Sequence, residues 1–326
     1  MKELKTKISS REPIYDQVLF LDGVSRAGKF LLGKICSNFK RVEYFQYIES
    51  LEHFPILNSL GFIEKDAAKS MMQIYLDYAI YNMSIGRGLN QRLDDSSSIT
   101  HATDFEDYVN RSKGHDGEEA IEKLKINNRL PSFLIHECMP FVEFFFETFP
   151  NLQMIHIERH PIDLAHSWFS RGLGKRFGLD PLVFAPTLQS KKGPIPWHAE
   201  SWKDLYADMS EVDRAIKSVC NLYMMSDKSY EKINSDRKDR ILKLGYENFF
   251  SSPNTVIEQL SKFLESSPYS NMGEVLKREG CHSEIPLSSR QAKLKELKNS
   301  ASKEIFEELT EASAKYESYW DLEKSY

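Results

Sequence analysis

The stretch Leu19–Ile35, LFLDGVSRAGKFLLGKI, carries the pattern that decides the fold. It begins inside an apolar run over residues 17–22, which predicts a buried β-strand. Two glycines, Gly23 and Gly28, follow this run, and apolar residues then return with helical spacing. The stretch therefore predicts a strand, a glycine-containing loop and a helix in direct succession.

The loop in this stretch has the chemistry of an anion site. Gly23, Gly28 and Lys29 have the G-x-x-x-x-G-K spacing of a phosphate-binding loop, whose amides lie at a helix N-terminus and favour negative charge. Arg26 and Lys29 add two cations. Phe30, however, stands where a kinase or ATPase has the Ser or Thr that ligates Mg²⁺. The alternative is an ordinary strand-to-helix turn with two exposed basic residues.

Composition limits the classes of protein that the chain can form. Its 326 residues are 41% hydrophobic, enough for one elaborated α/β domain, and a net charge of −5 excludes a general basic field for nucleic acid. Four widely spaced cysteines argue against a disulfide framework and a metal site. The N-terminus has no apolar signal region, and no window approaches the roughly 18 apolar residues of a membrane span. We expect a soluble, cytoplasmic protein.

Strand and helix patterns alternate along the rest of the chain. Strands are predicted at residues 41–49, 132–137, 152–160 and 240–246, and helices at 64–85, 141–149, 161–172 and from about 252. Residues 92–100 read as an exposed loop and residues 172–197 as a long loop. Residues 291–320 read as a charged, solvated helix that packs on the domain and is not an interaction arm. The alternation predicts a mostly parallel sheet with helices on both faces, whose ligands bind beyond the carboxyl ends of the strands.

A second motif follows the predicted strand at 152–160. Arg159 ends this strand, Pro161 suits the first turn of the next helix, and Asp163 and Ser167 follow. Together with the glycine loop, this pattern resembles the sulfotransferases that use 3′-phosphoadenosine 5′-phosphosulfate (PAPS). The resemblance implies that Arg159 and Ser167 hold the 3′-phosphate of PAPS and of its product PAP.

The glycine loop is similar to the 5′-phosphosulfate loop of the same family. Arg26, Ala27 and Gly28 match its basic, small and glycine positions, while Lys29 and Phe30 replace the usual hydroxyl residues. The resemblance implies that residues 25–30, Ser25 to Phe30, bind the 5′ end of PAPS, and that Arg26 and Lys29 stabilise charge during transfer. Sulfuryl transfer from PAPS needs no Mg²⁺, so no metal is expected.

The segment IHECMPF at residues 135–141 supplies two candidates for the general base. Glu137 and Pro140 resemble the strand end of glycan sulfotransferases, in which a Glu takes the proton of the acceptor. In the cytosolic phenol and steroid branch a His does so, which makes His136 a rival. Alternation along a strand predicts that only one of the two faces the cofactor, and we favour Glu137. Alternatively, Glu137 caps the next helix.

Tyr246 completes the resemblance, since the family has a Tyr near the adenine in a similar segment. The match spans residues 16–264 and implies a P-loop NTPase-like, three-layer α/β fold. We predict a single domain over 1–326, acceptor-site insertions at 48–130 and 172–200, and a helical segment at 291–326.

The predicted function is transfer of a sulfuryl group from PAPS to an acceptor hydroxyl, on a glycan or glycolipid. Two alternatives remain: a P-loop kinase or NTPase, and a non-catalytic protein that binds PAP or another nucleotide.

Overall fold

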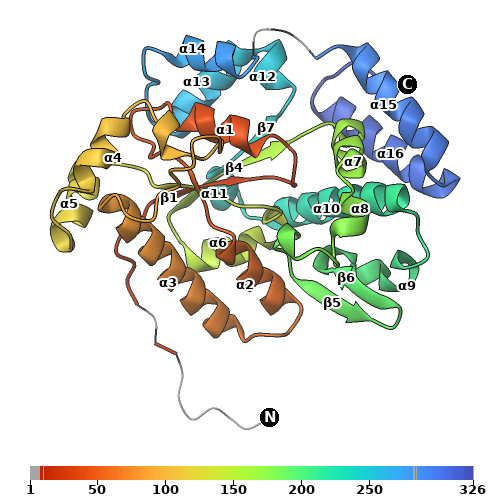
Figure 1. Cartoon of the computed structure of the whole chain (residues 1–326), viewed down its shortest axis with the longest axis horizontal. Helices are drawn as coiled ribbons and strands as arrows, with labels where there is room; N and C mark the ends of the chain where they lie inside the picture. The colour runs from red at the N-terminus through yellow and green to blue at the C-terminus, as the bar shows by residue number, and fades with distance from the viewer. Residues whose placement is uncertain (1–7, 10, 282, 284, 326) are drawn as a thin grey trace.

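The computed structural model describes residues 8–9, 11–281, 283 and 285–325. Its centre is a five-stranded sheet in the order β2-β3-β1-β4-β7, in which every neighbouring pair is parallel (Figure 1). The strands are β1 (Val18–Asp22), β2 (Gln46–Tyr47), β3 (Ser132–Leu134), β4 (Leu152–Glu158) and β7 (Ile241–Gly245). The predicted α/β class with a mostly parallel sheet is confirmed.

Helices cover both faces of this sheet (Figure 1). One face carries α1 (Lys29–Cys36), α13 (Pro253–Phe263) and α14 (Met272–Arg278), and the other carries α3 (Lys65–Ser84), α6 (Val142–Thr148) and α10 (Glu211–Lys232). All residues of β1 are consequently buried, and a strand buried on both faces reads as a continuous apolar run. The strand, loop and helix predicted at residues 17–35 therefore form the middle of the molecule.

The remaining α-helices lie in the two insertions, directly after β4, between the second insertion and β7, and toward the C-terminus. They are α2 (Ser50–Ser59), α4 (Phe105–Arg111), α5 (Glu118–Ile126), α7 (Pro161–Ser170), α8 (Leu173–Arg176), α9 (Lys203–Tyr206), α11 (Ser235–Lys238), α12 (Asn248–Ser251), α15 (Leu287–Ser300) and α16 (Lys303–Tyr319). Across the described part of the chain, none of the helices has the length and apolarity that a membrane crossing requires.

Two predicted loops and one predicted strand were wrong in extent. Residues 172–197 contain α8 and an antiparallel hairpin of β5 (Thr187–Ser190) and β6 (Gly193–Pro196), which turns at Lys191 and Lys192. Residues 92–98 form a loop as predicted, but residues 97–99 are buried, and Gln46 donates to the carbonyl of Ser97. The strand predicted at 41–49 shortens to β2, since the amides of Tyr44 and Phe45 donate to the side-chain hydroxyls of Tyr108 and Ser37 instead of to a neighbouring strand.

The C-terminal tail packs against the rest of the domain as predicted, but as two helices instead of one. It forms α15 and α16, which pack against α7 through buried polar contacts. The Arg290 guanidinium lies 2.8 Å from the Asp163 carboxylate, and His160 Nε2 lies 3.0 Å from Glu317. Residues 1–7 and Tyr326, which the predicted single domain includes, lie outside the described residues.

Candidate active site

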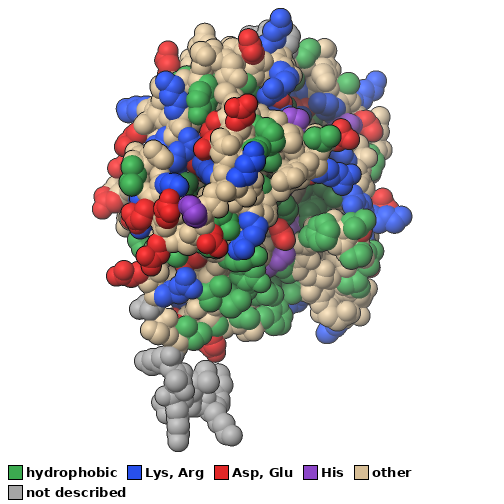
Figure 2. All heavy atoms as spheres, turned by 60° about the vertical axis from the view of Figure 1, so that its left-hand side comes forward, with side chains coloured by type: hydrophobic (Ala, Val, Ile, Leu, Met, Phe, Trp, Pro, Cys, Tyr) green, Lys and Arg blue, Asp and Glu red, His purple; other side chains and the backbone are tan. Residues whose placement is uncertain are grey.

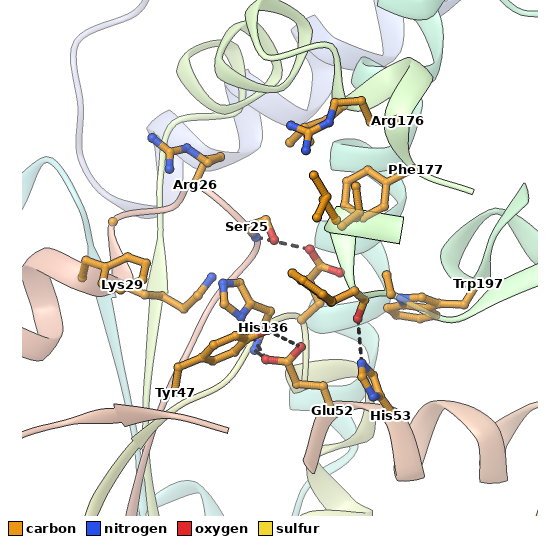
Figure 3. A pocket seen from close by; sticks show the side chains of 18 of the residues that line it. Ser25, Arg26, Lys29, Tyr47, Glu52, His53, His136, Arg176, Phe177 and Trp197 are labelled. Atoms are coloured by element: carbon orange, nitrogen blue, oxygen red, sulfur yellow. Dashed lines mark hydrogen bonds and ion pairs between the residues drawn. The ribbon is translucent and has the colours of Figure 1, made fainter. Parts of the chain in front are cut away.

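The carboxyl ends of the central strands meet at one edge of the sheet and enclose a cavity of about 490 Å³. The surface view in Figure 2 shows a hollow with apolar, basic and histidine side chains around it, and Figure 3 shows a pocket from close by. Nine of the predicted site residues line the cavity: Ser25, Arg26, Gly28, Lys29, Phe30, His136, Glu137, Arg159 and Tyr246. Segments far apart in the sequence are therefore brought together here.

Two predicted residues lie outside the cavity wall. Ala27 is fully buried beneath the glycine loop, and Ser167 is half-buried on α7. Their predicted roles in cofactor binding remain predictions.

The glycine loop, residues 23–28, is shaped by close packing. Arg26 adopts a φ of 77° and Gly28 a φ of 108°, and a Cβ at Gly28 would lie 2.4 Å from the ring of Tyr246. Only glycine fits position 28 without displacing that ring. Trp168 donates from Nε1 to the carbonyl oxygen of Ser25 at 2.7 Å, which anchors the loop to α7. The loop thus presents the Arg26 side chain to solvent.

Lys29 lies under the loop and is only 3% exposed. Its Nζ donates to the carbonyl oxygens of Gly23 at 2.7 Å and Val24 at 2.9 Å. Burial lowers the pKa of Lys29 to about 8, although the nearby carboxylates of Asp22 and Glu137 oppose the shift. The alternative of a turn with two exposed basic residues is therefore wrong for Lys29, which belongs to the floor of the cavity.

Three arginines gather beside the loop. Although Arg26 is exposed, partial desolvation of its guanidinium lowers its pKa, and the positive charges of Arg171 and Arg159 lower it further. The Arg159 guanidinium lies 4.5 Å from the centre of the Tyr246 ring, and its Nη1 donates to the Arg26 carbonyl at 3.1 Å. Its Nε is buried, with no hydrogen-bond partner among the described residues. Mutually repelling cations and an unpaired buried donor are the features of a site built for an anion.

The prediction that only one of His136 and Glu137 faces the site was wrong, because both line the cavity. Strand β3 ends at Leu134, before either residue, and Glu137 adopts a left-handed φ of 59°. Its backbone amide donates to the carbonyl of Gly23 at 3.1 Å, which holds this turn against the glycine loop. Strict alternation of side chains does not apply outside a strand.

Glu137 does not cap the next helix, as one alternative proposed. Its Oε1 accepts from the backbone N–H of Ser25 at 3.3 Å, within the glycine loop. The carboxylate of Asp22 accepts instead from the amides of Cys138 at 2.9 Å and Met139 at 3.0 Å. Burial raises the pKa of Glu137, while Lys29 and the Ser25 hydrogen bonds oppose that rise.

Glu52 on α2 is a site residue that sequence reasoning missed. It is 7% exposed, and its Oε1 lies 2.7 Å from the backbone nitrogen of His136 and 2.9 Å from His136 Nδ1 (Figure 3). Burial, together with the charge of Glu137, raises the pKa of Glu52 well above its ordinary value. In the sequence, Glu52 is one of two glutamates near the start of a helix, and no motif marks it as a site residue. Only the fold brings α2 to the end of β3.

The wall opposite the glycine loop is apolar. It comes from Ile56 on α2 and from the segment 173–197, which we call the lid segment and which contributes Leu173, Phe177, Leu182, Val183, Phe184, Ala185, Pro186 and Trp197. His53 Nε2 lies 2.8 Å from the carbonyl oxygen of Phe184 and links the lid segment to α2. Among the described lining residues, Arg176 is the charged side chain of this wall. The cavity thus has a cationic side and an apolar side.

Comparisons with known proteins found likeness at the level of structure alone. No family model matches the chain, and no curated protein matches it in sequence. The sulfotransferase domain from the curacin biosynthetic pathway aligns at 15% identity and a TM-score of 0.42, over 81% of this chain and 77% of that one. The corresponding domain of the Synechococcus PCC 7002 olefin synthase aligns at 14% identity and a TM-score of 0.41, over 83% and 79%.

A sulfotransferase from Mycobacterium avium aligns at 10% identity and a TM-score of 0.42, over 96% of this chain and 79% of that one. All three structures are sulfotransferases, the family that the sequence motifs resemble. The likeness is a distant one of fold, so the function is inferred from the side chains of the cavity.

Proposed function

We propose that the protein is a sulfotransferase that moves a sulfuryl group from PAPS to an acceptor hydroxyl. The observation that carries this proposal is the cluster of Arg26, Arg159 and Arg171 beside a glycine loop, with the buried Arg159 Nε left unpaired. An adenosine that carries phosphate groups at its 3′ and 5′ positions suits such a site, because each phosphate accepts charge-assisted hydrogen bonds from the arginines.

The residues present fit PAPS in type. Residues 25–30 would hold the 5′-phosphosulfate, Arg159 and Ser167 the 3′-phosphate, and Tyr246 would lie near the adenine. When bound, PAPS supplies the activated sulfuryl group, and the loop amides with Arg26 and Lys29 stabilise the negative charge that gathers on the leaving phosphate. Phe30 offers no oxygen to a metal, in keeping with a transfer that needs none.

We propose that the acceptor is a molecule with a hydroxyl group and a large apolar part. The apolar wall of the lid segment supports this, because burying apolar surface stabilises a ligand that presents such surface. A glycolipid combines the sugar hydroxyl favoured by the resemblance to glycan sulfotransferases with an apolar part that this wall can hold.

The first test is binding of PAP without Mg²⁺. We expect PAP at 100 times its dissociation constant to raise the unfolding free energy by about 2.7 kcal/mol, measured by thermal melting in EDTA. The stabilisation should be smaller at pH 9.5 than at pH 7, because Lys29, with a pKa of about 8, then loses its charge.

Thermal melting with ATP and Mg²⁺ tests the alternative of a P-loop kinase or NTPase. A P-loop kinase or NTPase would be stabilised by ATP with Mg²⁺ and not by PAP. A non-catalytic PAP-binding protein would be stabilised by PAP and would form no sulfated product. Mass spectrometry of reactions with PAPS and a panel of glycolipids, glycans and phenols separates this case from an enzyme.

A further inference from the structure

We propose that Glu52 is a positioning residue that makes His136 the general base of this site. This inference rests on the proposed sulfotransferase function, and it assigns the proton transfer to His136 instead of Glu137. It is carried by the hydrogen bonds between α2 and the turn after β3, which no sequence motif indicates.

The hydrogen bonds to Glu52 decide which nitrogen of His136 carries the proton. Glu52 Oε1 accepts from the His136 backbone N–H at 2.7 Å, so this oxygen acts as an acceptor. The same oxygen lies 2.9 Å from Nδ1, and it can accept a second hydrogen bond whether Glu52 is ionised or carries its own proton on Oε2. We therefore assign to His136 the tautomer with its proton on Nδ1. The lone pair is left on Nε2, for which the described residues provide no hydrogen-bond partner.

The imidazole is held at the cavity wall in a form that can accept a proton. Its side chain is 21% exposed, and the Tyr47 ring packs edge-on at 5.0 Å between ring centres. The titratable and charged groups around it are Glu52 from α2, Lys29 from α1, Tyr47 from β2 and the adjacent Glu137. Burial and the charge of Lys29 lower the pKa of His136 well below its ordinary value, so the ring is neutral at neutral pH.

Glu137 has a different task in this arrangement. Its carboxylate accepts from the Ser25 amide of the glycine loop and faces the Lys29 charge. A carboxylate bonded to the loop that binds an anion contributes to the shape and charge of that loop. His136 Nε2, in contrast, is free to meet an acceptor hydroxyl.

The proton transfer is coupled to the group transfer. The acceptor oxygen forms a bond to sulfur while the bond from sulfur to the 5′-phosphate oxygen of PAPS breaks and leaves its electron pair on PAP. The acceptor proton moves to His136 Nε2, and the imidazolium that forms lies against Glu52. His136 returns the proton to solvent after the sulfated product leaves.

The test compares Glu52→Ala and Glu52→Gln, with Glu49→Gln as the matched control. Glu49 precedes the same helix and is exposed. Glu52→Gln keeps an oxygen acceptor for Nδ1–H, whereas Glu52→Ala removes it. The assay uses an acceptor that wild type sulfates in the panel of glycolipids, glycans and phenols. We expect kcat to fall roughly 10-fold to 100-fold in Glu52→Ala and less in Glu52→Gln. PAP affinity should stay within about threefold of wild type. Glu49→Gln should match wild type.

A second readout does not depend on turnover. The ¹⁵N chemical shifts of His136, assigned by comparison with His136→Gln, should show the Nδ1–H tautomer in wild type and in Glu52→Gln. Glu52→Ala should show a mixture of tautomers. Thermal melting of each variant shows whether it is folded, and if Glu52→Ala is not, Glu52→Gln and His136→Gln carry the test.

The outcomes separate this proposal from the proposed function. If Glu52→Ala keeps the Nδ1–H tautomer, or if Glu137→Gln abolishes turnover while His136→Gln retains it, the assignment to His136 and Glu52 is overturned. If the predicted tautomers are observed but wild type forms no sulfated product with any acceptor, the pairing stands and the proposed function fails.

Discussion

Under the proposed function, Arg159 is the residue that we expect to contribute most to the recognition of PAP. Its backbone N–H donates to the Tyr223 hydroxyl at 3.0 Å, and its guanidinium contacts both the Arg26 carbonyl and the Tyr246 ring. These contacts hold the side chain in one orientation while its Nε remains buried and unpaired within the described structure. A buried unpaired donor costs roughly 1 to 3 kcal/mol, and a bound phosphate would remove this cost.

We predict that Arg159→Ala weakens PAP binding by roughly 10-fold or more, because a charge-assisted hydrogen bond is worth about 1.5 to 3 kcal/mol. Adenosine 5′-phosphosulfate, which lacks the 3′-phosphate, should bind nearly as before. Ser167→Ala should have the same selectivity with a smaller effect, because a hydroxyl carries no charge. Isothermal titration calorimetry measures both, with the exposed Arg92→Ala as the control. Equal losses for the two ligands would show that these residues support the fold alone.

The lid segment is the element that completes the cavity. Phe177 is buried and stacks on Trp168 at 4.9 Å between ring centres, which fixes the base of the segment to α7. Further along, Leu182 is 68% exposed and Phe184 is 63% exposed, although both line the cavity. The lid segment is thus anchored to α7 at its start and carries exposed apolar side chains at the cavity rim. This arrangement suits a segment that closes on the apolar part of an acceptor.

We predict that Leu182→Ser and Phe184→Ser each raise the KM for the acceptor several-fold and leave PAP affinity unchanged. Each substitution removes apolar contact with the acceptor. A loss of about 1 kcal/mol of binding free energy corresponds to a roughly fivefold higher KM. Leu179→Ser is the matched control, since Leu179 belongs to the same segment, is 63% exposed and does not line the cavity. An equal rise in KM for the control would mean that the substitutions disturb the segment as a whole.

At the scale of the molecule, the two C-terminal helices hold α7 in place behind the site. Asp163 in the first turn of α7 accepts from Arg290 Nε at 2.8 Å and from Lys293 Nζ at 2.6 Å, both on α15. Burial would raise the pKa of Asp163, but the hydrogen bonds from Lys293 and Arg290 outweigh it and lower that pKa. The position of Arg159, just before α7, therefore depends on the C-terminus of the chain.

We predict that Arg290→Met lowers the unfolding free energy by about 3 kcal/mol at pH 7, because it leaves the buried Asp163 carboxylate with one cation fewer. Since the folded pKa of Asp163 is lower than the unfolded one, this stabilisation is present above the ordinary value of 3.8 and is lost as the pH falls through the folded pKa. Urea denaturation at pH 7 and pH 3 measures it. Lys295→Met, an exposed change on the same helix, should have little effect.

The sequence by itself determined the features that depend on neighbouring residues. The apolar run over 17–22, the glycines of the loop and Pro161 after Arg159 predict a buried strand, a phosphate-binding loop and a helix start. The structure has the strand, a loop with a left-handed glycine and the helix start, while phosphate binding stays a prediction. These signals are local, because burial of a parallel strand and the left-handed φ of Gly28 constrain the residue types directly.

Only the tertiary structure decided which groups surround His136 and which segment forms the apolar wall of the cavity. Glu52 and His136 are 84 positions apart, and nothing near either residue signals the other. The left-handed φ of Glu137 is held by contacts with the glycine loop, so alternation along a strand gave the wrong answer there. The lid segment and the C-terminal helices likewise depend on distant partners, because the cost of burying a charge or exposing an apolar side chain is set by what the fold packs against it.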